Sequence, residues 1–305
     1  MNKNSCHLLD IHIEKVWEGE TPENLFKKIW AVPRKLTHEL RMSKGVMLNG
    51  EPINWLAPLH TGEHLTILLP EDSDYGVMPA DLPLQVVYED EHVLVANKPA
   101  GMDTHPNSSS ETDTLANAVA GHYRSRNEIR KVRHVHRLDR DTTGAVLFAK
   151  HALIHPILDR MLTERKIKRT YVALADGLLK NEAGHIDLPI GRDRHHATRR
   201  RVSPTGQKAL THYRVLEHFP KERLTLIECQ LDTGRTHQIR VHMSAIGHPL
   251  AGDRLYGGSP RFPRQALHAG MLSLTHPFTE QKLEITADFL DSPAIFEPYA
   301  PPFSK

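Results

Sequence analysis

The sequence predicts an α+β protein, with mixed α/β character, in which a small α+β domain precedes a large mixed, mostly antiparallel β-sheet with flanking helices. Its 305 residues exceed what one small core needs, and 39% apolar with 25% charged residues is typical of globular proteins. From residue 84 onward, strand-like segments are interspersed with helical ones. We expect a small domain over residues 1–75, a linker over 76–83 and a larger domain over 84–305.

Two helices are expected in the small domain. The first begins after Thr21, which has the side chain of an N-cap residue and is followed by Pro22 at the first helical position and by an acid in the first turn. The second helix is expected over residues 34–42.

Strands and a linker complete the small domain. Residues 46–52 predict strand, turn and strand, because Asn49 and Gly50 form a dipeptide typical of tight hairpins. Residues 62–69 predict a closing strand. The segment 70–83 is rich in Asp, Pro and Gly and is typical of a connection rather than of a helix or strand.

The larger domain is expected to be mainly β. Helical spacing of apolar residues predicts helices over residues 114–120 and 155–162. β-branched and apolar runs predict strands over residues 84–88, 92–97, 145–149, 171–175, 211–216 and 224–231. The class is therefore α+β with one large sheet.

Composition limits where the protein works. No apolar run approaches the roughly 18–20 residues that a membrane helix needs. The N-terminus lacks the apolar core of a signal peptide, and Cys6 and Cys229 form no CxxC pattern. We expect a cytoplasmic protein without a disulfide framework, with no membrane association, no obligate protein partner and a monomeric state.

The distribution of charge indicates a polyanion partner, although the net charge is only +2. Residues 124–140 hold seven Lys or Arg against two acids, and five arginines between 192 and 201 are opposed only by Asp193. Basic clusters gain affinity for phosphates by releasing counterions. A solvated, salt-bridged surface is the alternative for either cluster alone, but two clusters together favour RNA.

The order of elements in the small domain resembles the RNA-binding domain named after ribosomal protein S-four, over about residues 20–70. Residues 1–80 carry 8 basic against 11 acidic side chains, so any RNA contact would be confined to one helical face. A packing module with ordinary surface charge is the alternative. The basic residues on or near the two helices are Lys27, Lys28, Arg34, Lys35, Arg41 and Lys44.

One carboxylate of the first basic cluster stands directly among its arginines. Asp139 lies between Arg137 and Arg140, and the turn residues Thr142 to Gly144 lead into the apolar segment 145–149. An acid would be repelled by a polyanion, so we interpret Asp139 as a residue that does chemistry rather than binding. A helix cap or a surface salt bridge is the ordinary role of a single aspartate.

Four segments together resemble the RluA family of pseudouridine synthases over about residues 84–290. They are residues 87–101, His136–Gly144, Thr233–Met243 with 247–253, and Leu267–Ala269 with His276 and Pro277. The resemblance implies that a uridine in RNA is detached at nitrogen 1, rotated and rejoined through carbon 5. Since uracil is a tolerable leaving group, one carboxylate is enough, and no metal, nucleotide or redox cofactor is implied.

The resemblance assigns three catalytic residues. Asp139 matches the catalytic aspartate, acting either as nucleophile at the anomeric carbon or as base toward the 2′ hydrogen. Tyr171 matches the active-site tyrosine, whose ring can stack on uracil. Arg235 matches the arginine that pairs with the aspartate. Arg169 stands where relatives often have lysine, and Asp141 falls at a variable position and receives no role.

The same resemblance assigns residues to RNA. Uridine in folded RNA must be flipped out, and Arg137 is placed to fill the gap in the stack. Lys98 to Gly101 are expected to shape the cleft floor through Pro99 and Gly101 rather than through charge. The full set expected to contact RNA is Arg137, Arg140, Thr142, Arg199, Arg200, Arg201, His237 and Arg240.

Two other classes of function stay open. The spacing His134-x-His136-x-x-Asp139 superficially suggests a metal hydrolase, although Arg140 beside a metal would be unfavourable. A non-catalytic RNA-binding or chaperone protein is the second alternative. The RNA itself, ribosomal or transfer, is not specified by the motifs.

Overall fold

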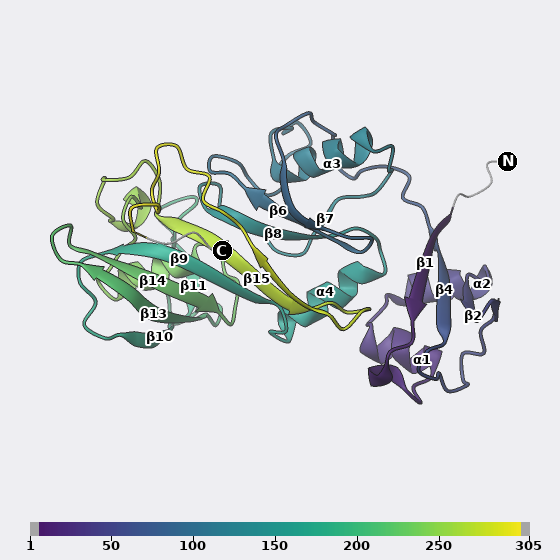
Figure 1. Ribbon diagram of the computed structural model, residues 1–305. Coiled ribbons are helices and arrows are strands. Elements are labelled where there is room, and N and C mark those ends of the chain that lie inside the picture. Colours follow the sequence, from purple (N-terminus) through teal and green to yellow (C-terminus); the bar gives the residue numbers. More distant parts are fainter. Residues whose placement is uncertain (1–5, 300–305) are drawn as a thin grey trace.

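The computed structural model describes residues 6–299, which form a small and a large β-sheet side by side (Figure 1) and a separate two-stranded sheet. The smaller sheet has the order β1-β4-β2-β3 and is antiparallel throughout. Its strands are β1 (Cys6–His12), β2 (Val46–Leu48), β3 (Glu51–Pro52) and β4 (His64–Pro70). Strand β1 was not predicted from the sequence; its Leu9 and Ile11 alternate into the core beside the closing strand β4.

The helices of the small sheet begin and end close to where the sequence predicted them. Helix α2 (Arg34–Met42) has the expected bounds, and the Thr21 hydroxyl accepts a hydrogen bond from the Asn24 N–H at 3.2 Å, as an N-cap does. The first helix is short and continues as a π-helical turn. The remaining elements are η1 (Lys15–Trp17), α1 (Pro22–Asn24) and η2 (Leu25–Ile29).

The Asn-Gly dipeptide forms the expected tight hairpin between β2 and β3. Asn49 has φ +52° and Gly50 has φ +84°, as both central residues of such a turn require. The segment that follows β4, residues 71–84, has neither helix nor strand, but it packs against Asn117 of helix α3 (Leu115–Ser125), beside the large sheet. Met78 O accepts from the Asn117 amide at 2.7 Å, and Ala80 N–H donates to Asn117 O at 3.1 Å.

The large sheet is mostly antiparallel, which confirms the expected fold class. Its main order is β10-β13-β14-β9-β15-β8-β6-β5, with β16 paired to β15 and β7 paired to β8. Only the pairing of β8 with β15 is parallel among the described strands. The strands are β5 (Gln85–Glu89), β6 (Val93–Lys98), β7 (Arg133–His134), β8 (Thr143–Ala149), β9 (Lys168–Asp176), β10 (Ala183–Asp187), β13 (Leu210–Phe219), β14 (Leu224–Leu231), β15 (Leu267–Thr275) and β16 (Lys282–Thr286).

Helices and one hairpin surround this sheet (Figure 1). They are α3 (Leu115–Ser125), α4 (Ile154–Thr163), α5 (Gln238–Ala245), the turn η3 (Arg254–Tyr256) and the separate two-stranded sheet β11 (Ile190–Arg192) and β12 (Arg200–Val202). Helices α3 and α4 cover the predicted segments, whereas α5 was not predicted. Within residues 6–299, no helix is both long and apolar enough to cross a membrane.

The two sheets share one apolar cluster, so their relative placement is set by packing. Trp30, which follows η2, lies 5.3 Å from Phe278, in the turn between β15 and β16, measured between ring centroids. Both rings are buried. Leu9 and Val93, from the two different sheets, belong to the same cluster. The division into two domains therefore stays a proposal, because a continuous core joins them.

A close approach of two strands fixes the end of β8 nearest the expected catalytic turn. Gly144 has φ +113°, and a Cβ placed on it would lie 2.2 Å from the carbonyl oxygen of Ala269 on β15. No other residue type fits there without moving one of the strands. The neighbouring Thr143 hydroxyl bonds His268 Nδ1 at 2.8 Å, which ties the same two strands together.

Candidate active site

Asp139 lies in a turn that is held from three sides. Thr142 N–H donates to Asp139 O at 3.0 Å and closes the turn. The Thr104 hydroxyl accepts from Leu138 N–H and donates to Leu138 O, both at 3.0 Å. The two Thr104 contacts join positions 34 residues apart, so the turn is held by packing as well as by its own local hydrogen bond.

Lys98 supplies the third support, from inside the protein. Its ammonium donates to the carbonyls of Pro99 (2.9 Å), Met102 (2.7 Å) and Arg140 (2.7 Å). Burial lowers the pKa of Lys98 to about 7. The expectation that this segment acts only through Pro99 and Gly101 was therefore incomplete, since the lysine joins two loops at the site.

The ion partner of Asp139 is Arg240. Arg240 Nη1 donates to Asp139 Oδ2 at 3.2 Å, while Nε and Nη2 donate to the two oxygens of Asp253 at 2.7 and 2.9 Å. The side chain of Arg240 is 9% exposed and that of Asp253 is 1% exposed. Burial alone would lower the pKa of Arg240, but the hydrogen bonds and charges of both carboxylates raise it above its ordinary value.

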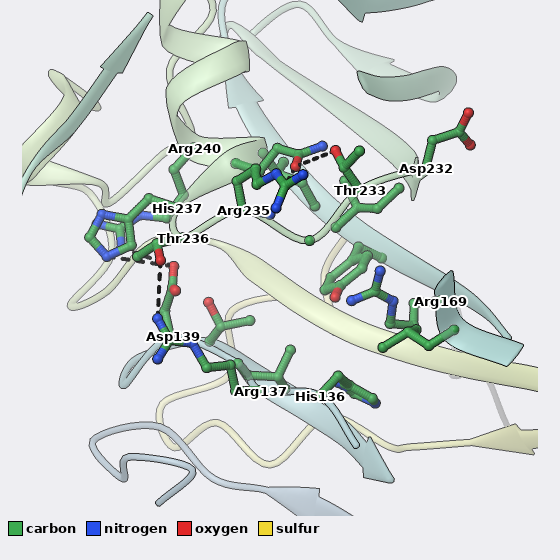
Figure 2. A pocket seen from close by; sticks show the side chains of 18 of the residues that line it. His136, Arg137, Asp139, Arg169, Asp232, Thr233, Arg235, Thr236, His237 and Arg240 are labelled. Atoms are coloured by element: carbon green, nitrogen blue, oxygen red, sulfur yellow. Dashed lines mark hydrogen bonds and ion pairs between the residues drawn. The ribbon is translucent and has the colours of Figure 1, made fainter. Parts of the chain in front are cut away.

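Two predictions are corrected by this arrangement. Arg235 was expected to pair with Asp139, but its Nε donates to Lys208 O at 3.1 Å, and Figure 2 shows it apart from the carboxylate. Arg240 was expected to contact RNA, but it is buried between two carboxylates. Arg240 rather than Arg235 reaches Asp139 because the chain changes direction just before α5, at His237, which has φ +59°.

Gln238, the first residue of α5, fixes this path. Its side-chain Oε1 accepts from the Arg235 backbone N–H at 3.0 Å and from the Thr233 hydroxyl at 2.7 Å. Its Nε2 donates to Leu210 O at 3.0 Å. The loop that carries Arg235 is thereby fastened to β13, while the inner face of α5 turns Arg240 toward Asp139.

A cavity of about 600 Å³ opens beside Asp139 and is lined by Tyr171, Arg137 and Arg235 among others. Tyr171 lies on β9, is 4% exposed, and has a pKa raised by burial against the opposing charge of Arg169. Both contacts of Asp139 are made through Oδ2, so among the described residues Oδ1 has no hydrogen-bond or ion-pair partner. The cavity thus presents a carboxylate oxygen, a tyrosine ring and several cationic groups.

Three sets of arginines, which we call the arginine rim, lie beside Asp139 or beside Tyr256. Arg137 is exposed, and its Nη2 donates to the Thr236 hydroxyl at 3.0 Å (Figure 2). Arg140 is exposed and pairs with Asp103 at 2.9 Å. The hairpin of β11 and β12 carries Arg199, Arg200 and Arg201, of which Arg199 and Arg201 are exposed. Arg137, Arg140, Arg199 and Arg201 are therefore accessible to a phosphate backbone, and Arg200 is half-buried.

Tyr256 joins the arginine hairpin to the site. Its hydroxyl accepts from the Arg200 backbone N–H at 2.9 Å and lies 2.8 Å from His237 Nδ1. His237 Nε2 lies 3.9 Å from Asp139 Oδ2, and burial lowers the pKa of His237. The side chain of His237 therefore belongs to the framework of Asp139, with little left for an RNA contact.

Thr142 also differs from expectation. It is 2% exposed, and its hydroxyl accepts from the Gln265 amide at 3.2 Å. We therefore assign the Thr142 hydroxyl to holding the turn rather than to contacting RNA.

Asp253 and Tyr256 belong to the site but were not predicted from the sequence. Asp253 lies in the segment 247–253 that resembles the family, but nothing in its neighbours indicates that its carboxylate is buried against Arg240. Tyr256 lies outside the four segments that resemble the family, and no local pattern indicates its role. Both act through contacts made only in the folded chain.

The histidine spacing that suggested a metal site does not bring its members together. The His134 ring stacks on His105 with centroids 4.8 Å apart, and His136 Nε2 accepts from the Leu147 N–H at 3.2 Å. Over residues 6–299, no group of three or more His, Cys, Asp or Glu side chains is arranged to hold a metal ion.

Two protein-family profiles match the chain, one in each of its two parts. A profile of the RNA pseudouridylate synthase family matches residues 92–245. A profile of the RluD ribosomal pseudouridine synthase N-terminal domain matches residues 9–65. The first match runs from β6 through α5, and the second runs from within β1 to the start of β4.

Individual relatives give the same answer. The chain is 45% identical to an uncharacterized RNA pseudouridine synthase, YhcT, of Bacillus subtilis, covering 92% of this chain and 93% of the relative. It is 41% identical to ribosomal large subunit pseudouridine synthase D of Pasteurella multocida, covering 81% of each chain. The solved structure of human RNA pseudouridylate synthase domain containing 1 matches with a TM-score of 0.56 and 28% identity, covering 68% of this chain and 84% of that one.

Proposed function

This chain belongs to the RNA pseudouridylate synthase family and is an RNA pseudouridine synthase, and we propose that Asp139 is the carboxylate that carries the isomerisation. One observation supports this assignment most directly. Asp139 is clamped through Oδ2 by a buried arginine, while Oδ1 is unpaired beside a cavity that Tyr171 also lines. A carboxylate that is held in place and keeps one free oxygen is what either catalytic role requires.

The reaction exchanges one glycosidic bond for another. As the N1–C1′ bond breaks, its electron pair stays on uracil, and Asp139 either bonds C1′ or removes the 2′ proton. The ring then rotates and C5 bonds C1′, which breaks the Asp139–C1′ bond in the first route and takes the proton back from Asp139 onto C2′ in the second. The C5 proton is lost and N1 gains a proton, so that no atom is added or removed. We assign the removal of the C5 proton to the hydroxyl of Tyr171, because Tyr171 and Asp139 line the same cavity.

RNA is held by the arginine rim and the target base is flipped into the cavity. Arg137 is exposed at the mouth, so its guanidinium can occupy the space that the uridine leaves in the stack. Arg140, Arg199 and Arg201 are exposed and are assigned to phosphates. This attraction weakens with added salt, as for other contacts to phosphate.

We propose that the substrate is ribosomal RNA of the large subunit. The relatives named ribosomal large subunit pseudouridine synthase D support this choice, as does the match of residues 9–65 to the N-terminal domain of RluD. Pseudouridine maps of ribosomal and transfer RNA from a deletion strain and its parent test it. We expect a site missing from large-subunit RNA, and sites missing only from transfer RNA would overturn this part of the proposal.

The catalytic assignment is tested with RNA that carries tritium at carbon 5 of uridine, isolated from the deletion strain. The wild-type protein should release tritium to water, and Asp139→Asn should abolish release while RNA binding persists. Asp141→Asn is the matched control, since that carboxylate lies two residues away and has no assigned role. Release by Asp139→Asn would overturn the assignment, and no release by the wild type would favour a non-catalytic RNA-binding protein.

A further inference from the structure

Two buried N–H groups without a protein acceptor line the cavity that Asp139 shares. Arg169 Nε and His136 Nδ1 are both buried and have no hydrogen-bond partner within residues 6–299. His136 Nε2 accepts from Leu147 N–H, so the hydrogen-bond network assigns the ring proton to Nδ1. Folded proteins rarely leave buried donors unpaired, so both groups indicate an acceptor supplied by a ligand.

The position of Arg169 follows from β9 and from one glycine. Arg169 and Tyr171 are two residues apart on a strand and therefore project from the same face. A Cβ placed on Gly234 would lie 3.2 Å from Arg169 Nη1, so the guanidinium rests against backbone where any larger residue would crowd it. Figure 2 shows Arg169 and His136 on the side of the cavity away from Asp139.

Of the two donors, only Arg169 places a positive charge beside Tyr171. Burial lowers the pKa of His136 well below its ordinary value, so the imidazole is neutral and donates only through Nδ1. Arg169 remains charged, as guanidinium groups in proteins do. This wall of the cavity therefore offers hydrogen-bond donors and one positive charge, and these two side chains offer no acceptor toward a bound base.

We propose that Arg169, with His136, recognises the carbonyl edge of the flipped uracil and stabilises the uracil anion formed when the N1–C1′ bond breaks. The electron pair of that bond spreads from N1 onto O2 and O4, and a guanidinium at either oxygen stabilises the charge. The inference rests on the proposed role of this cavity as the catalytic site.

The geometry of the rotation fits a wall made of donors. Turning uracil about the axis through N3 and C6 exchanges N1 with C5 and, at the same time, O2 with O4. A donor on the wall therefore meets a carbonyl oxygen before and after the rotation. Cytosine keeps O2 but carries an amino group in place of O4, so a donor placed at O4 would face another donor, and the base would be rejected.

A leaving-group test separates this role from a structural one. Arg169→Gln should slow conversion of uridine by about 100-fold, as loss of one charge-stabilising donor does. The same variant should slow glycosidic cleavage of 5-fluorouridine by less than about tenfold, because fluorine already stabilises the anion. Arg169→Lys, which keeps the charge, should recover most of the uridine rate. Equal slowing of both substrates by Arg169→Gln would overturn the role.

A binding test does not depend on turnover. In the Asp139→Asn background, RNA with uridine at the target should bind at least about tenfold more tightly than RNA with cytidine there, since a donor facing a donor is left unpaired. Adding Arg169→Gln should remove most of this preference, because its amide can also accept a hydrogen bond. An unchanged preference for uridine would overturn the role of Arg169 but would not affect the catalytic role proposed for Asp139. Failure of the proposed function would instead show as no tritium release by the wild type.

Discussion

Asp253 accepts two hydrogen bonds from the guanidinium of Arg240, at 2.7 and 2.9 Å, and this buried pair fixes the direction of the remaining nitrogen. That nitrogen donates to Asp139. Asp253 therefore influences the expected catalytic carboxylate indirectly, by fixing the guanidinium that donates to it. Arg240 lies 101 residues from Asp139 and 13 from Asp253 in sequence, so the chain of contacts is entirely a product of folding.

Removing the buried carboxylate of Asp253 should lower both the stability of the fold and the rate of turnover. Asp253→Ala leaves Arg240 with one partner, and the free energy of unfolding should fall by about 3–5 kcal/mol, as for other broken buried pairs. Turnover should fall by roughly 100-fold because Asp139 loses its fixed position. Urea unfolding and tritium release measure the two effects. Asp291→Ala removes the partner of another buried arginine, Arg264, and should destabilise the protein comparably with a smaller loss of rate.

The gap-filling role of Arg137 predicts a dependence on RNA structure. Arg137→Ala should reduce turnover on folded RNA by at least about tenfold, while a short unpaired RNA should be affected much less, because no stacked base has to be replaced. Arg214→Ala is the control, since this exposed arginine pairs with Glu228 on the neighbouring strand and does not line the cavity. Unchanged turnover of Arg137→Ala on folded RNA would contradict the role.

The close approach at Gly144 predicts a large loss of stability from one methyl group. Gly144→Ala places a Cβ 2.2 Å from Ala269 O, so β8 and β15 must separate at the site. We expect at least about 4 kcal/mol of destabilisation, beyond the usual range for single substitutions. Gly247→Ala is the matched control, because it shares a positive φ (+85°) but has no atom within 4 Å of the added Cβ. It should cost only about 1–2 kcal/mol of backbone strain. Similar losses in both variants, measured by thermal or urea unfolding, would show that crowding is not the cause.

Buried histidines predict a loss of stability in mild acid. Burial lowers the pKa of His92 and of His268 to about 4, below the ordinary value of 6.5. Between pH 6.5 and 4 the unfolded chain binds more protons than the folded one, so stability is full above pH 6.5 and falls as the pH drops. Each group contributes a slope of at most about 1.4 kcal/mol per pH unit.

The slope can be assigned to one residue by comparing variants. His268→Gln should lower stability at every pH, but its loss between pH 6.5 and 4.5 should be shallower than that of the wild type. His185→Gln, at an exposed position on β10, should keep the wild-type slope. Urea unfolding at several pH values measures both, and an unchanged slope in His268→Gln would contradict the assignment.

Local sequence was enough for elements whose signals are local. Helix α2 has the bounds that its pattern predicts, and the Asn49-Gly50 turn has the positive φ angles that the dipeptide favours. Strand β1 was missed because its alternation is short and its partner β4 lies more than fifty residues away. Helix α5 was missed because its start depends on the left-handed conformation of His237, which no residue type requires.

The sequence by itself determined the fold class, the family resemblance and the position of Asp139 among arginines, because these depend on residue order, composition and short spacings. Only the tertiary structure decided that Arg240 rather than Arg235 meets Asp139, and that Asp253 and Tyr256 belong to the site. The physical reason is that a salt bridge depends on the direction of a side chain. For α5 that direction is set by Gln238 and by the reversal at His237, whose partners lie far away along the chain.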